Sequence, residues 1–197
     1  CWMGPLARVA QHAFYGHMLM HMGVVAVAAG LLAAAVAGSR YDPARRFPRL
    51  FAAIPASAGE LIIVWAWHAP ALHLAARHHT LGFVAEQAMF LACGLWVWIS
   101  ALGGPTPRVG DRTAAGIVGL LLTSMHMTLL GALLIFAPRP LYAHHADASG
   151  SLTALADQQW GGAIMILVGG ATYLAGGLWL TANLLRGSEV ELQNKAI

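Results

Sequence analysis

Five long apolar runs constrain the fold of this chain more than any other feature. They cover residues 13–37, 50–67, 81–102, 114–137 and 160–185. An α-helix needs about 20 mostly apolar residues to cross the hydrocarbon core of a bilayer. Only 10% of the residues are charged, whereas soluble domains carry about 25%. The sequence therefore predicts a polytopic all-α transmembrane bundle, with residues 1–197 forming one domain.

The basic residues predict how this bundle is oriented, because cytoplasmic loops are enriched in Lys and Arg. The segments after the first, third and fifth runs hold Arg40, Arg45, Arg46, Arg49, Arg108, Arg112, Arg186 and Lys195. The opposite side holds Arg8, Arg77 and Arg139. We therefore expect the N-terminus outside and the C-terminus in the cytoplasm. Cys1 at an external end is typical of a cleaved signal peptide, and a lipid on Cys1 at the outer side is one form of that processing.

Small residues predict where the helices pack closely. Gly162, Gly169 and Gly176 recur every seven residues in the last run, with Gly170 and Gly177 beside them. Small residues let helix backbones approach each other in lipid. We expect the last helix to contact its neighbours along this row.

The densest group of metal-binding side chains lies at the head of the first run, where residues 12–22 read HAFYGHMLMHM. His17 and His21 are four residues apart and share a helix face, and Met18 and Met22 repeat this spacing one position later. Imidazole and thioether groups together suit cuprous copper. Two alternatives remain open: the histidines could be a hydrogen-bonded packing pair, and methionine is a common core residue.

Further ionisable residues fall inside or beside the other runs, where they are costly unless paired, ligated or neutral. Glu60 and His126 are expected near mid-bilayer, and Glu86 nearer the outer face. The candidate metal ligands are His17, His21, His126, Met18, Met22, Met125, Glu60, Glu86, His68, His79 and Asp157. Asp157 could instead be the N-cap of the helix that follows it.

Four stretches together resemble the CtaG family of membrane proteins, which is linked to assembly of caa-type cytochrome c oxidase. They are the segment from His17 to Met22, Trp67-His68-Ala69-Pro70-Ala71-Leu72, His79 with Glu86 and Phe90, and Asp157-Gln158-Gln159-Trp160-Gly161-Gly162 with Ile164-Met165. The chain departs from the family at Gln87, where members often have a histidine.

This resemblance implies a copper-binding factor of the bacterial inner membrane that helps to mature an oxidase. The expected partners are a cytochrome c oxidase subunit, membrane lipid and a periplasmic copper donor, with no nucleic acid. An enzyme is not expected, because the chain has no recognisable nucleophile–base pair or phosphate loop. Three alternatives remain: a haem b protein that holds the iron between His21 and His126, a copper transporter, and a structural oxidase subunit.

Overall fold

The computed structural model describes residues 2, 4–104, 109–142 and 152–195, and every regular element in these ranges is helical. In chain order the elements are α1 (Pro5–His12), α2 (Phe14–Met22), the π-helical segment η1 (Gly23–Ala28), α3 (Ala29–Val36), α4 (Pro43–Arg46), α5 (Ala53–His68), α6 (Pro70–His78), α7 (Thr80–Leu102), α8 (Val109–Phe136) and α9 (Ala154–Lys195). The predicted all-α fold is confirmed. Cys1 and Arg108 lie outside the described residues.

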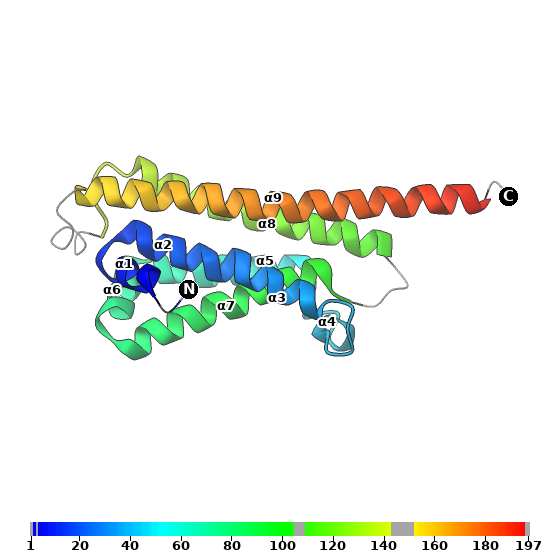
Figure 1. Ribbon diagram of the computed structural model, residues 1–197, viewed down its shortest axis with the longest axis horizontal. Helices are drawn as coiled ribbons and strands as arrows, with labels where there is room; N and C mark the ends of the chain where they lie inside the picture. Colours follow the sequence, from blue (N-terminus) through cyan, green and yellow to red (C-terminus); the bar gives the residue numbers. More distant parts are fainter. Residues whose placement is uncertain (1, 3, 105–108, 143–151, 196–197) are drawn as a thin grey trace.

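The long helices run along the bundle in alternating directions, beginning with the continuous pass of α2, η1 and α3 (Figure 1). Four stretches of the described residues are long and apolar enough to cross a membrane: Phe14–Val36, Thr80–Leu102, Asp111–Phe136 and Ala154–Arg186. The predicted run at 50–67 becomes α5, which has only 16 residues. At 1.5 Å per residue α5 is about 24 Å long, shorter than the roughly 30 Å hydrocarbon core.

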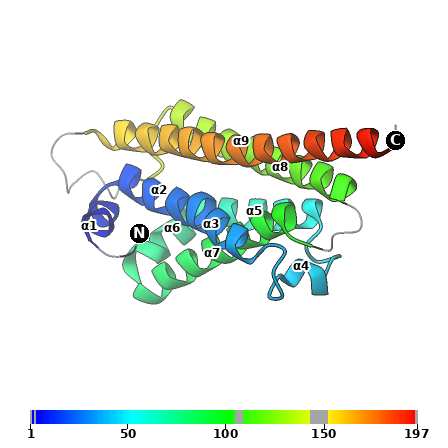
Figure 2. The same cartoon turned by 45° about the vertical axis from the view of Figure 1, so that its right-hand side comes forward.

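The two ends of the bundle differ in charge, as the sequence predicted. Figures 1 and 2 show α1 and α6 at one end, and α4 with the C-terminal end of α9 at the other. Arg45 and Arg46 lie in α4, and Arg112 lies near the start of α8 at that same end. Arg8 and Arg77 lie in α1 and α6. This distribution agrees with an external N-terminus and a cytoplasmic C-terminus.

A break in the helix between α5 and α6 lets α6 fold over the end of the bundle that also holds α1. Ala69 is extended, with φ −65° and ψ 133°, and Pro70 begins α6. A residue before proline is disfavoured in the α conformation, and proline itself is favoured in the first helical turn. The predicted apolar run ends at residue 67, but the residues after His68 form a further helix that buries His73 and Ala76.

The glycine row of α9 faces other helices, as predicted. A Cβ atom on Gly162 would meet Gly131 and Leu134 of α8, one on Gly169 would meet Met22, and one on Gly176 would meet Trp98. The adjacent Gly170 and Gly177 have nothing within 4 Å of the same position. Gly94 of α7 lies directly against the backbone of η1. A Cβ atom on Gly94 would overlap the carbonyl oxygen of Val25.

We expect Gly94→Ala to destabilise the protein by about 1–3 kcal/mol, the usual cost of overpacking a tight contact. The added methyl group would force α7 away from η1, since the obstacle is backbone and cannot rotate aside. Thermal unfolding in detergent, followed by circular dichroism, measures the effect. Gly170→Ala is the matched control and should leave the midpoint unchanged. Equal midpoints for the two variants would contradict this packing.

Candidate metal centre

Helix α2, which carries His17 and His21, is held in place by a carboxylate of the last helix, α9. Ala13 is extended, and α2 begins at Phe14. The Asp157 carboxylate of α9 accepts hydrogen bonds from the backbone N–H groups of Phe14 at 2.7 Å and Tyr15 at 2.9 Å. A helix N-terminus has unsatisfied N–H groups and a positive dipole end. Asp157 therefore caps α2 and does not cap its own helix. This cap fixes the turn that carries His17.

Three buried side chains from three helices converge beside this turn: His17 of α2, His73 of α6 and Glu86 of α7. One ligand atom from each lies within 4.8 Å of the other two. His17 Nε2 is 3.4 Å from Glu86 Oε1, and the rings of His17 and His73 are 5.1 Å apart and nearly perpendicular. Two donors on one tetrahedral ion with bonds of about 2.1 Å are about 3.4 Å apart. The cluster thus has the donor types and spacing of a metal site.

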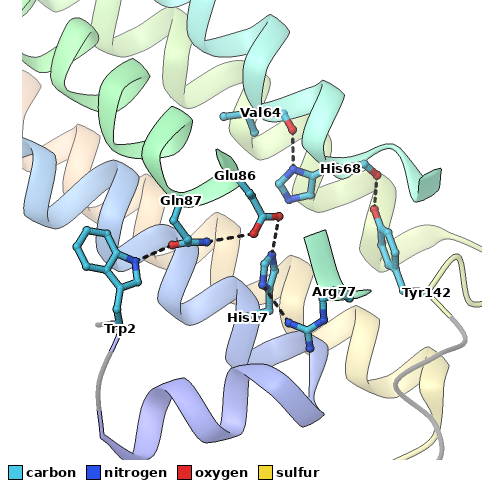
Figure 3. Close-up of polar contacts among 8 residues, drawn as sticks. All are labelled: Trp2, His17, Val64, His68, Arg77, Glu86, Gln87 and Tyr142. Atoms are coloured by element: carbon cyan, nitrogen blue, oxygen red, sulfur yellow. Dashed lines mark hydrogen bonds and ion pairs between the residues drawn. The ribbon is translucent and has the colours of Figure 1, made fainter. Parts of the chain in front are cut away.

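The carboxylate of Glu86 is oriented by a short hydrogen-bond chain (Figure 3). Gln87 Nε2 donates to Glu86 Oε2 at 3.2 Å, and Trp2 Nε1 donates to Gln87 Oε1 at 3.0 Å. Glu86 Oε1, which faces His17, is buried without a hydrogen-bond partner. One oxygen is therefore held by the protein and the other is left with a free lone pair, an arrangement typical of metal-binding carboxylates.

Arg77 of α6 touches the other side of His17 (Figure 3). Its Nη1 lies 3.5 Å from His17 Nδ1. A guanidinium can only donate, so this contact needs the lone pair on Nδ1 and leaves the imidazole proton on Nε2, toward Glu86. Burial lowers the pKa of Arg77, and Glu86 and Asp157 oppose that shift. Arg77 thus supplies positive charge beside Glu86, and a cation entering the cluster would have to compete with it.

A cavity of about 550 Å³ lies at the external end of the bundle, beside the cluster. Its lining includes His73 and Arg77 together with His78, His79 and Met20. His78 and His79 are exposed, whereas Met20 is buried. Histidine, methionine and the cluster residue His73 therefore share one space.

A second pair of buried histidines lies one helical turn further along α2. His21 and His68 have ring centroids 5.2 Å apart, and Phe90 packs 4.0 Å from the His21 ring. His68 Nδ1 is 2.7 Å from the Val64 carbonyl oxygen, to which it donates, so its Nε2 carries the lone pair. That Nε2 and both nitrogens of His21 are buried without hydrogen-bond partners. These two predicted residues lie near the cluster but outside its 4.8 Å limit.

The other predicted ligands lie elsewhere. Met18 and Met22 pack against α9, where Cβ atoms on Gly161 and Gly169 would meet them at 3.0 and 2.9 Å. Met125 is 60% exposed and His79 is the exposed residue before α7. Glu60 and His126 face each other deeper in the bundle. His21 and His126, the predicted axial pair for haem, therefore have different neighbours.

His73 and Arg77 are the site residues that sequence reasoning missed. Both lie beyond the predicted run at 50–67, and neither was among the candidate metal ligands. The sequence does contain a signal for this helix. Pro70 can begin a helix, and His73 and Ala76 follow at helical spacing on one face, which would have placed His73 inward. No signal in the sequence indicated that Trp2 and Gln87 would orient Glu86.

Comparison with known proteins identifies the family of the chain. Neither the curated proteins nor the solved structures compared with the chain include a match. The family model for the cytochrome c oxidase caa3 assembly factor (Caa3_CtaG) matches residues 1–187. That range includes each residue of the cluster and every helix of the bundle except the last eight residues of α9. The chain belongs to the Caa3_CtaG family of cytochrome c oxidase assembly factors.

Proposed function

We propose that this protein binds copper at His17, His73 and Glu86 and delivers it to a subunit of cytochrome c oxidase in the bacterial inner membrane. The observation that carries the proposal is the convergence of two imidazoles and one carboxylate from α2, α6 and α7 within 4.8 Å. Imidazole nitrogen is a good ligand for copper, zinc, iron and nickel. The link of the family to an oxidase supports copper among these metals.

The cavity supports a role in handing copper over. It lies at the external end and combines His78, His79 and Met20 with His73 of the cluster. Exposed histidines at the rim and a buried thioether would offer weaker positions through which a copper ion could exchange with a periplasmic donor. Burial of all three cluster residues would then retain the ion until the partner subunit is present.

The charge of Arg77 gives a test specific to this site. We expect Arg77→Gln to strengthen copper binding about tenfold, which corresponds to about 1.4 kcal/mol. The reason is that removing a cation 3.5 Å from His17 relieves repulsion of the metal and frees His17 to change its tautomer. Competition titration with a copper chelator measures this change. Arg139→Gln, an exposed arginine outside the cluster, is the control; equal affinities for both variants and the wild type would contradict the role assigned to Arg77.

Elemental analysis with a visible spectrum tests the proposal itself. Detergent-purified protein loaded with copper and desalted should retain at least one copper per chain without a Soret band. When the copper-loaded protein is added to membranes from cells that lack this protein, it should restore copper to their oxidase. Retention of iron with a Soret band would favour the haem alternative, and oxidase that acquires full copper without the protein would contradict delivery.

A further inference from the structure

A second group of buried polar side chains lies deeper in the bundle and is not used by the site described above. It consists of Glu60 on α5, His126 on α8 and Tyr173 on α9. Glu60 is fully buried, His126 is 6% exposed and Tyr173 is 2% exposed. Glu60 precedes His68 by eight residues, which is about 12 Å along α5. The three residues come from helices other than those that carry the first cluster.

Three polar atoms of this group have no hydrogen-bond partner within the described residues. Tyr173 Oη donates to Glu60 Oε1 at 3.2 Å. Glu60 Oε2 and both ring nitrogens of His126 are buried without a hydrogen-bond partner. A carboxylate and an imidazole in apolar surroundings are costly unless they are paired or ligated. Three unpartnered atoms on two adjacent side chains therefore need a further explanation.

The distance between the two side chains points to an ion. His126 Nε2 lies 3.8 Å from Glu60 Oε2, which is too long for a hydrogen bond. Two metal–ligand bonds of about 2.0–2.2 Å span at most about 4.4 Å. One cation can therefore bind both atoms, while the Tyr173 hydroxyl orients the carboxylate through its other oxygen, as groups around metal ligands commonly do.

We propose that Glu60 and His126 form a second metal site for a divalent transition ion, with Tyr173 as the positioning residue. One oxygen and one nitrogen donor suit ions of the Zn²⁺ and Cu²⁺ class better than a soft monovalent ion. The second site does not require the first to bind copper. Its position gives the protein two metal sites at different depths, formed by different helices.

The experiment uses the full chain in detergent with the first cluster disabled by His73→Gln and Glu86→Gln. Cobalt(II) is the probe, because its visible absorption reports ligation. We expect one Co²⁺ per chain in this background, and at least a tenfold weaker affinity after Glu60→Gln or His126→Gln. Tyr173→Phe should weaken binding less, because it removes only the orienting hydrogen bond. His12→Gln, an exposed histidine bonded to its own helix, is the control and should change nothing.

Two results would overturn the second site. The first is that the background protein binds no Co²⁺, although gel filtration and circular dichroism show a folded, monodisperse bundle. Glu60 and His126 would then be neutral or bridged by water. The other is a cobalt X-ray absorption spectrum of the background protein with two imidazoles, which would place the ion at His21 and His68. This spectrum needs no substitution in the second site, so it decides the question even if Glu60→Gln fails to fold. Either result would leave the proposed copper site untouched, because copper binding by the wild-type protein is measured in a separate assay.

Discussion

His73→Gln should remove one copper equivalent per chain and weaken binding at the first cluster at least about 100-fold, or about 2.8 kcal/mol. His73 is 4% exposed and supplies one of the two imidazoles, and it is the only cluster residue on the short covering helix α6. Glutamine keeps a polar side chain of similar size but has no strong donor for copper. A chelator competition titration, with elemental analysis after desalting, measures both the loss and the change in affinity.

The matched control for this substitution is His78→Gln. His78 lies on the same helix and lines the same cavity, but it is exposed. The equilibrium affinity of this control should equal that of the wild type. Equal copper retention in His73→Gln and His78→Gln would contradict the assignment of His73 to the site and would return attention to His21 and His68.

Asp157→Ala should have the largest effect on the fold, because it removes the cap that joins α9 to α2. Its carboxylate accepts from two backbone N–H groups, one of them buried. Hydrogen bonds to a charged group contribute about 1.5–3 kcal/mol each. We expect a loss of about 2–5 kcal/mol, allowing for partial access of water to the exposed helix end. Differential scanning fluorimetry in detergent measures the shift in midpoint.

The same substitution should also weaken copper binding, because α2 carries His17 one turn beyond the cap. Asp157→Asn should recover part of the stability, since an amide keeps one acceptor oxygen. Asp111→Ala removes an exposed acidic residue from the first turn of α8 and is the control. A wild-type midpoint in Asp157→Ala would show that the two hydrogen bonds do not hold α2 in place.

Hydropathy and glycine spacing were enough to predict the long helices and the packed face of α9. These features follow from bilayer thickness, which requires long apolar runs, and from close backbone approach, which requires small residues at helical spacing. The end of α5 was harder to predict. Residues 50–67 were apolar enough for a full span, but the helix begins at Ala53 and is followed by the break at Ala69.

The sequence indicated His17 and Glu86 as candidate ligands but could not show which neighbours they would meet. Rotation of a helix about its axis is determined by packing: on α2, His17 faces Glu86, whereas Met18, the next residue, packs against Gly161 of α9. A shift of one position therefore separates the predicted thioethers from the imidazole. His73 was missed because its place depends on how α6 folds back over the bundle, a tertiary contact that short-range patterns do not encode.

X-ray absorption at the copper edge tests the central claim most directly. Wild-type protein loaded with half an equivalent of copper should give a ligand shell of two imidazole nitrogens and a carboxylate oxygen, and His73→Gln should lose one imidazole from that shell. A shell dominated by sulfur, or one with two imidazoles that His73→Gln leaves unchanged, would contradict a copper site formed by His17, His73 and Glu86.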